Sequence, residues 1–412
     1  MKSVNAISVM LQGSRVGEMV AIPRQGVFFS YDPGWLAKGF NLAPFHMEFS
    51  VKPQRAVDPV LFDGLHGVFS DSLPDGWGLL LMDRFFRSQL GVERHSIGPL
   101  DRLAYMGNRS MGALEYVPTF ETVVTDEELD LAALYEASQT ILSGSTDEVI
   151  TSLRLAGGSP GGARPKAVIG LSPDKQRAVS SFGDMPAGFE HWLIKFRSEG
   201  DPRESGAIEQ VYAMMARKAG IDISESKLFQ VETSKGIEQF FATKRFDREA
   251  GAKRHMLSAA AILYADFRAP SLDYSDLLRA TWAMTRDATE VEKMARLMVF
   301  NAIAHNRDDH AKNFSFFGGR DGWRMTPSYD LTFSSTGGHG NEHTTAFAGR
   351  GKPSRKAMIE VCKSFSFLEP ERYIAQTLDA FSEWSACCAE LEIDKSKSQK
   401  LLTVLESVWK AL

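Results

Sequence analysis

Residues 305–317, HNRDDHAKNFSFF, form a dense polar cluster between two regular elements, and their role needs an explanation. The residues before it, EVEKMARLMVFNAIAHN (290–306), have apolar side chains at the 3.6-residue period of a helix. The apolar run 314–317 and the strand-like residues 323–325 predict a β-hairpin after it. Asp, Asn and His are common turn residues, so a polar turn between helix and hairpin is one interpretation of the cluster.

The spacing within the cluster supports a second interpretation. His305 and Asp308 stand in the pattern His-x-Arg-Asp, and Asn313 follows five residues after Asp308, as in the catalytic loop of a kinase. There the Asp orients or deprotonates the acceptor hydroxyl, and the Asn binds a metal that bridges the nucleotide phosphates. Asp330, in TPSYDL, then stands where a second metal-binding carboxylate is expected. Asp309 is an alternative candidate for the catalytic role. Only Asp308 fits both the His-x-Arg-Asp pattern and the five-residue step to Asn313.

Three upstream features are in the order that a phosphoryl-transfer site needs. The segment GGSPGGARPKA (157–167) is rich in glycine, which lets backbone N–H groups approach phosphate closely, although it also suits a flexible linker. Lys195 lies in the predicted strand HWLIKF, where a solvent-facing edge lysine is the alternative. Glu209 opens a predicted helix over 207–219, where a first-turn Glu also complements the helix dipole.

The order of predicted elements indicates an α+β chain. Short strands occupy the first 50 residues, and a helix follows Ser72 and Asp75. A second predicted helix has Thr125 as its N-cap, with Glu128 three residues on. Strands dominate again over 166–247, and helices after 255. We expect a β-rich subdomain over 1–110, an N-lobe with the glycine-rich loop over 111–250, and a helical C-lobe over 251–412.

Composition limits the classes of protein that remain. The 412 residues exceed the usual size of a single core, and a net charge of -5 does not suit a chain that binds nucleic acid over its whole surface. The three cysteines have no metal-ligand spacing and favour a reducing compartment. We expect neither a signal peptide nor a membrane span, and therefore a cytoplasmic protein without a membrane partner.

The chain resembles the HipA family, toxin kinases of bacterial type II toxin–antitoxin modules with a protein-kinase-like core. The resemblance rests on motifs that keep the family's order between residues 70 and 333: SLPDGWG, GGARPKA, HWLIKF, ATKRFDR and NRDDHAKNFSFF…TPSYDL. It implies a two-lobed, protein-kinase-like fold with a small β-rich N-terminal subdomain and a mainly helical C-terminal lobe.

The resemblance also implies roles for individual residues. Asp308 is the catalytic residue, and Asn313 and Asp330 are the Mg²⁺ ligands. Ser159 is the loop serine that autophosphorylates and switches the kinase off. The residues implied to bind ATP lie in the glycine-rich loop, on the lysine strand, at the hinge between the lobes and in the catalytic motif: Gly161, Gly162, Ala163, Arg164, Lys195, Lys244, Phe246, Asp247, His310 and Lys312. Lys244 and Phe246 offer backbone groups to adenine, and Asp247 lies near the ribose.

The function implied is that of an ATP- and Mg²⁺-dependent serine/threonine protein kinase with a translation-related target, such as an aminoacyl-tRNA synthetase. The implied partner is a HipB-like helix-turn-helix antitoxin, through which alone the chain would contact DNA. Two alternatives stay open: a small-molecule kinase on the same scaffold, and a catalytically weak regulator that binds DNA only with an antitoxin. We interpret both GGHGNEHTT (337–345) and the basic segment GRGKPSRK (349–356) as solvated loops, the latter with a possible role at DNA phosphate.

Overall fold

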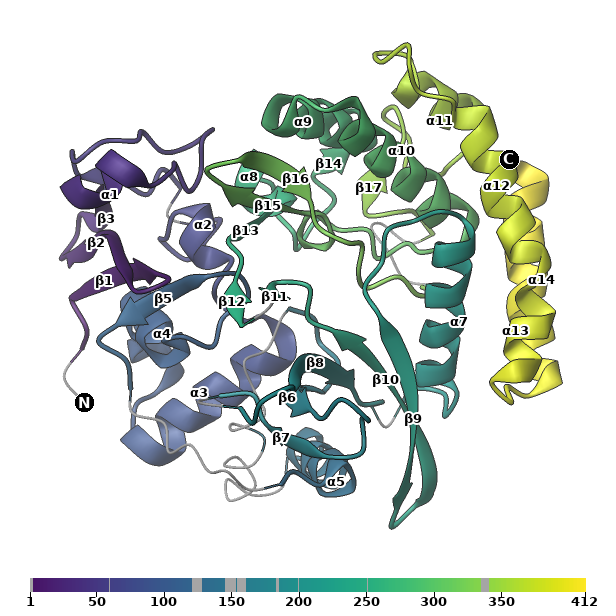
Figure 1. Ribbon diagram of the computed structural model, residues 1–412, viewed down its shortest axis with the longest axis horizontal. Coiled ribbons are helices and arrows are strands. Elements are labelled where there is room, and N and C mark those ends of the chain that lie inside the picture. The colour runs from purple at the N-terminus through teal and green to yellow at the C-terminus, as the bar shows by residue number, and fades with distance from the viewer. Residues whose placement is uncertain are drawn as a thin grey trace. The chain divides into compact units, whose positions relative to one another are not determined.

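The computed structural model describes residues 3–58, 60–120, 128–144, 153, 161–182, 185–198, 200–249, 251–334 and 341–412. The chain divides into two compact units. The first comprises residues 1–202, 229–257 and 318–320, and the second comprises 203–228, 258–317 and 321–412. Mixed α and β structure, β-rich toward the N-terminus and helical toward the C-terminus, confirms the expected fold class (Figure 1).

The N-terminal part of the first unit is an antiparallel sheet in the order β4-β3-β2-β1-β5. Its strands are β1 (Ala6–Leu11), β2 (Ser14–Ile22), β3 (Gly26–Tyr31), β4 (Gln54–Arg55) and β5 (Leu114–Val117). Side chains alternate between buried and less buried in β1 and β3, as expected for a sheet with one face on a core. The predicted early strands are confirmed, and β5 adds a strand from beyond residue 110.

Short helices accompany this sheet in the first unit: α1 (Pro33–Lys38), α2 (Gly67–Ser70), α3 (Gly76–Leu90), the 3₁₀ turn η1 (Arg94–Ser96) and α4 (Pro99–Met106). The predicted helix after Ser72 and Asp75 is α3, and Asp75 is its N-cap residue. The Asp75 carboxylate makes no capping bond to the helix. It accepts a hydrogen bond from the Gly162 amide instead, which joins α3 to the glycine-rich loop.

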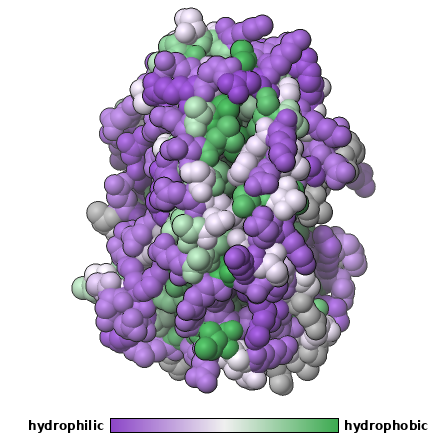
Figure 2. Space-filling model, turned by 90° about the vertical axis from the view of Figure 1, so that its right-hand side faces the viewer, coloured by the Kyte–Doolittle hydropathy of each residue, from purple (hydrophilic) through white to green (hydrophobic). Residues whose placement is uncertain are grey.

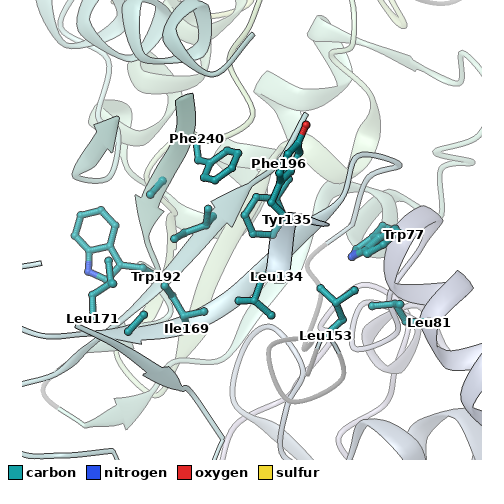
Figure 3. Close-up of a cluster of buried hydrophobic side chains, with 14 of the residues drawn as sticks. Trp77, Leu81, Leu134, Tyr135, Leu153, Ile169, Leu171, Trp192, Phe196 and Phe240 are labelled. Atoms are coloured by element: carbon teal, nitrogen blue, oxygen red, sulfur yellow. The ribbon is translucent and has the colours of Figure 1, made fainter. Parts of the chain in front are cut away.

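The second sheet of the first unit has the order β7-β6-β8-β10-β9. Its strands are β6 (Lys166–Leu171), β7 (Ala178–Ser180), β8 (Glu190–Lys195), β9 (Ser226–Thr233) and β10 (Gly236–Lys244). Two short strands follow, β11 (Arg248–Glu249) and β12 (Ala252–Lys253). Against this sheet pack α5 (Leu131–Leu142) and part of α3, through a core that includes Trp77, Tyr135, Trp192, Phe196 and Phe240 (Figure 3).

The predicted start of α5 was wrong. The helix begins at Leu131, and its N-cap is Asp130, whose carboxylate accepts a hydrogen bond from the Ala132 amide at 2.9 Å. Glu128 instead forms an isolated bridge with Val179, and Thr125 lies outside the described residues. Asp is a strong N-cap and stands next to the apolar helical face, whereas the bridge holds Glu128 in an extended conformation.

Helices dominate the second unit: α7 (Ser205–Lys218), α8 (Ala259–Leu263), α9 (Tyr274–Thr285), α10 (Ala288–Ile303), α11 (Arg355–Cys362), α12 (Pro370–Ser382), α13 (Trp384–Glu390) and α14 (Lys395–Ala411). Short β elements join them: β13 (Met256–Ser258), β14 (Leu272–Asp273), β15 (Ser315–Gly319), β16 (Gly322–Met325) and β17 (Thr345–Ala346). The predicted hairpin is confirmed as β15 and β16.

The long helix α10 packs against α9, α11, α12 and α14 in the second unit and leads into the polar motif 305–313. Its N-cap, Asp287, accepts a hydrogen bond from the Thr289 amide at 2.8 Å, and its side chains are almost all buried from Leu297 to Ile303. Burial on all sides explains why the second half of α10 has almost only apolar side chains. The side of the molecule with α11 to α14 is mostly hydrophilic, with hydrophobic side chains gathered in a narrow band (Figure 2).

Candidate functional site

The polar motif 305–313 begins where α10 ends. His305 has a φ of 54°, a left-handed conformation that turns the chain out of the helix. The amide of Asn306 then donates to the Asn301 carbonyl at 3.0 Å, and the two side chains are also bonded, Nδ2 of Asn306 to Oδ1 of Asn301, at 3.0 Å. Burial lowers the pKa of His305 to about 4, so this imidazole is neutral at physiological pH. The first residues of the loop are therefore held to the end of α10 by two hydrogen bonds.

The side chain of Asp308 is 59% exposed, which leaves its carboxylate open to a substrate. Asn313 Nδ2 donates to the backbone carbonyl of Asp308 at 2.7 Å, across the five-residue step that the sequence indicated. This bond turns the Asn313 carbonyl oxygen, a ligand that Mg²⁺ accepts, away from the Asp308 carbonyl. The five-residue spacing thus closes the loop through one hydrogen bond between the Asn313 side chain and the Asp308 backbone.

His310 lies beside the Asp308 carboxylate, with Nε2 4.0 Å from Oδ1. Its Nδ1 accepts a hydrogen bond from the Lys312 amide at 3.2 Å and caps the 3₁₀ turn η3 (Ala311–Asn313). Because Nδ1 accepts this bond, the N–H of the ring is on Nε2, the atom nearer Asp308. Lys312 Nζ lies 4.0 Å from the centroid of the Phe267 ring.

The neighbouring carboxylate has the opposite environment. Asp309 is 1% exposed, and hydroxyl, imidazole and backbone donors surround its carboxylate. Of the two adjacent acids, only Asp308 can therefore reach an acceptor hydroxyl without breaking buried hydrogen bonds. This contrast supports the assignment that the sequence spacing favoured.

The turn that carries Asp330 is attached to the same loop. The Tyr329 hydroxyl donates to the Lys312 carbonyl at 2.6 Å and lies 2.6 Å from Oγ of Ser315. Asp330 has a φ of 58° and is half-buried. Carboxylate and amide oxygens are hard ligands, so Asp330 and Asn313 fit Mg²⁺ by the chemistry of their donor atoms. Within the described residues no group of three His, Cys, Asp or Glu side chains forms an all-protein metal cage.

In the first unit, two lysines stand opposite each other on adjacent strands. Lys195 at the end of β8 pairs with Lys166 at the start of β6, so both side chains project from one face of the sheet. The register therefore places two cationic side chains close together on one face of this sheet. Lys166 is 4% exposed, and its Nζ donates to the Gly161 carbonyl. Sequence reasoning missed Lys166, because the register that places it opposite Lys195 is set by the pairing of two strands and not by a local pattern.

The glycines after residue 160 are required by close packing. A Cβ on Gly161 would lie 2.8 Å from the Asp75 carboxylate, and one on Gly162 would lie 2.6 Å from Lys166 Nζ. Gly162 also has a φ of 103°, in a region that favours glycine. Ala163 is exposed, and Arg164 Nη2 lies 3.3 Å from Asp201 Oδ1. Ser159 lies outside the described residues.

The residues implied to form the hinge lie at the end of β10. Lys244 Nζ is 2.5 Å from Oε1 of Glu190, and Phe246 is half-buried. Burial raises the pKa of Glu190, but Lys175 and Lys244 outweigh it and lower that pKa to about 2. The side chain of Lys244 is therefore engaged with Glu190, which agrees with a nucleotide contact through the backbone. The hinge contacts themselves stay a prediction.

Asp247 has a different environment from the one that a ribose contact needs. Its side chain is fully buried and accepts hydrogen bonds from Arg245 Nε and Nη2 at 2.9 and 2.7 Å, from Arg248 Nη1 at 2.7 Å and from the Gly112 amide at 2.8 Å. Burial alone would raise the pKa of Asp247, but the two guanidinium groups hold it well below its usual range. The geometry favours a structural role, and the ribose contact stays a prediction.

These features are those of the phosphoryl-transfer class: a glycine-rich loop and paired lysines in one unit, and an Asp-x4-Asn loop with a following Asp in the other. Family models for the HipA N-terminal domain and the HipA-like C-terminal domain match residues 7–117 and 158–390. The chain therefore belongs to the HipA family and has the scaffold of its toxin kinases, which confirms the resemblance seen in the sequence.

Individual relatives are distant. A Sinorhizobium fredii protein named "Putative kinase Y4dM" is 29% identical over 153 residues, which span 34% of this chain and 36% of that protein. The Shewanella oneidensis HipA, solved in a complex with HipB and its operator DNA, has a TM-score of 0.69 at 16% identity, over 98% of this chain and 95% of that one. This likeness establishes the shared fold. The Helicobacter pylori kinase CtkA has a TM-score of only 0.31, at 11% identity over 52% of this chain and 92% of that one.

Proposed function

We propose that this protein is a toxin-type serine/threonine protein kinase that transfers the γ-phosphoryl group of ATP to a hydroxyl group of a protein. The observation that carries the proposal is the exposed Asp308, whose backbone carbonyl is bonded to Asn313 while its neighbour Asp309 is buried. The bond from Asn313 to the Asp308 backbone holds the two residues at the spacing of a kinase catalytic loop, while the Asp308 side chain stays 59% exposed.

The residues of the catalytic loop have separable roles in the transfer. The bond from the γ-phosphorus to the bridging oxygen of ADP breaks as the bond to the acceptor oxygen forms, and the hydroxyl proton passes to Asp308. Nε2 of His310 lies 4.0 Å from the Asp308 carboxylate, beyond hydrogen-bond distance, and would donate instead to a phosphoryl oxygen beside it. Asn313 and Asp330 would hold Mg²⁺, which when bound neutralises phosphate charge.

The paired lysines and the glycine-rich loop would bind the phosphates of ATP. Lys166 joins Lys195 as a second cation for the phosphate chain, because register places both on one face of the sheet. Gly161, Gly162, Ala163 and Arg164 form the loop, and the hinge residues Lys244 and Phe246 would contact adenine through the backbone. Such charge stabilisation is the main contribution that a protein makes to phosphoryl transfer.

Autophosphorylation of Ser159 would regulate the same loop. A phosphoserine carries a charge of about -1.5 to -2 at pH 7, and Ser159 lies two residues before Gly161, whose carbonyl accepts from Lys166. The phosphate on Ser159 would compete with those of ATP for the lysines. The kinase would then be inactive until the phosphate is removed.

The partners proposed for the chain follow from its family. A HipB-like helix-turn-helix antitoxin would bind it and would be its link to DNA, as the Shewanella HipA was solved with HipB and operator DNA. The substrate would be a translation-related protein in the cytoplasm, such as an aminoacyl-tRNA synthetase. Among the described residues no helix is both long enough and apolar enough to cross a membrane.

The test is incubation with γ-labelled ATP and Mg²⁺, followed by mass spectrometry of this chain and of a cell lysate. The wild type should label Ser159 and one or a few lysate proteins, and Asp308→Asn should reduce both signals by about 10²–10⁴-fold. Asp321→Asn, at an exposed Asp beside the β15–β16 hairpin, is the matched control and should behave as the wild type. Equal labelling by wild type and Asp308→Asn would refute the proposal. Label on metabolites alone would favour a small-molecule kinase, and no label would favour a DNA-binding regulator.

A further inference from the structure

The carboxylate of Asp309 is the centre of a buried polar network beside the catalytic residue. Its Oδ1 accepts hydrogen bonds from the backbone amides of Thr344 and Thr345 at 2.8 and 3.1 Å. Its Oδ2 accepts from the Tyr274 hydroxyl at 2.7 Å and lies 2.9 Å from Nδ1 of His343. Every group directed at this carboxylate can donate, as a buried negative charge requires.

His343 is therefore part of this network and not of a solvated loop. It is 3% exposed, its ring packs edge-on against Phe347 with the centroids 5.1 Å apart, and its amide donates to the Gly351 carbonyl at 2.8 Å. The interpretation of residues 337–345 as a solvated loop was wrong at this position. No periodic pattern in the sequence indicates that His343 faces an acid 34 residues earlier.

A second path connects the network to the end of α10. The Tyr274 hydroxyl accepts from Asn301 Nδ2 at 2.9 Å, and Asn301 Oδ1 accepts from Asn306 Nδ2 at 3.0 Å. Asn306 lies two residues before Asp308. Asn306 and Asp309 stand on either side of Arg307 and Asp308 in the sequence. Their side chains both belong to one buried chain of hydrogen bonds. That arrangement fixes the main chain of Asp308 from both sides.

The segment 343–346 is joined to the catalytic loop by further bonds. The Thr344 hydroxyl donates to the Arg307 carbonyl at 3.0 Å, and the Thr345 hydroxyl donates to the Asp309 carbonyl. Residues 345–346 form β17 and pair with β14 in parallel, which places them next to the start of α9. The turn that carries Asp330 is also joined to this loop, because the Tyr329 hydroxyl donates to the Lys312 carbonyl.

We propose that Asp309 is a positioning residue, which ties the segment 343–346 to the catalytic loop and so holds Asp308 in the orientation needed for transfer. This inference rests on the proposed kinase function, in which Asp308 is the catalytic residue. Asp309 touches no reacting atom. It acts through the backbone that it shares with Asp308 and through the four donors that its charge holds in place.

The variant Asp309→Asn tests this role with little change of shape. The amide can still accept from Thr344 and Thr345, but its NH₂ group then faces the hydroxyl and the imidazole that donate to Oδ2 in the wild type. The matched control is again Asp321→Asn. If Asp309→Asn does not fold, His343→Ala removes one of the four donors and leaves the charge with three.

Two measurements separate positioning from a loss of folded protein. The first is hydrogen exchange at the amides of residues 344 and 345, which should speed up by about tenfold or more while the buried amides of α10 keep their rates. The second is turnover per nucleotide-binding site, counted by titration with a fluorescent ATP analogue. It should fall by about tenfold or more with less than about a twofold change in nucleotide Kd.

Unchanged exchange at residues 344 and 345, or unchanged turnover per binding site, would overturn the proposal. A role only in folding would reduce the number of binding sites and leave turnover per site as in the wild type. If the wild type itself transfers no phosphate, the proposed kinase function fails. The exchange measurement then decides by itself whether Asp309 holds the segment 343–346.

Discussion

Replacing Asp247 with alanine distinguishes the two roles that sequence and structure give to this residue. The carboxylate is fully buried between Arg245 and Arg248, whose side chains are 3% and 7% exposed. Its removal leaves two guanidinium groups without their shared counter-ion and the Gly112 amide without its acceptor. Breaking a buried pair by removing one partner costs about 3–5 kcal/mol, a large part of the 5–15 kcal/mol by which most domains are stable.

The assay is urea denaturation followed by tryptophan fluorescence, since Trp77 and Trp192 are buried in the same unit. Asp247→Ala should lower the midpoint by on the order of 1–2 M urea. The control is Glu249→Ala, two residues after Asp247. It removes an ion pair between Glu249 Oε2 and Arg254 Nη1 at 2.9 Å, in which the Glu249 side chain is 67% exposed and the Arg254 side chain 25%. That change should cost no more than about 1 kcal/mol.

Nucleotide binding by the same variants completes the test. If Asp247 has the structural role, the folded fraction of Asp247→Ala at low temperature should bind ATP with nearly the affinity of the wild type. The reasoning is refuted if the urea midpoint moves no further than in Glu249→Ala while ATP affinity falls. That result would place Asp247 at the ribose, as the family resemblance implied.

Two further predictions concern stability. Burial lowers the pKa values of four histidines to about 4, namely His66, His191, His255 and His305. Because their pKa is about 6.5 in an unfolded chain, the unfolded state binds more protons than the folded state between pH 6.5 and pH 4. The melting temperature should therefore be constant above about pH 6.5 and fall toward pH 4. A flat melting profile from pH 7 to 4.5 would contradict this. Phe240→Ala should destabilise by about 3–5 kcal/mol, because Phe240 is fully buried with ring centroids 4.9 Å from Phe196 and 5.2 Å from Tyr135. Ile237→Ala, on the same strand but at a position 65% exposed, should change stability by less than about 0.5 kcal/mol in the same denaturation series.

Local sequence patterns were enough to predict most elements in their order, together with the spacing of the loop 305–313. Strand alternation and helical periodicity are local properties, so β1 to β3, α7, α10 and the β15–β16 hairpin were predicted correctly. The five-residue step from Asp308 to Asn313 is local as well, and the bond between Asn313 Nδ2 and the Asp308 carbonyl closes that step. Short-range geometry follows from spacing alone.

What each charged side chain faces depends on contacts between distant parts of the chain, and these became visible in the fold. Asp308 and Asp309 are adjacent and chemically identical in the sequence, yet one is exposed and the other is surrounded by donors from residues 274 and 343–345. Lys166 became a candidate only when strand register placed it opposite Lys195. Burial and cross-chain hydrogen bonds depend on residues distant in sequence, which no local pattern records. These long-range contacts explain why Asp247 and His343 have structural environments that their motifs did not indicate.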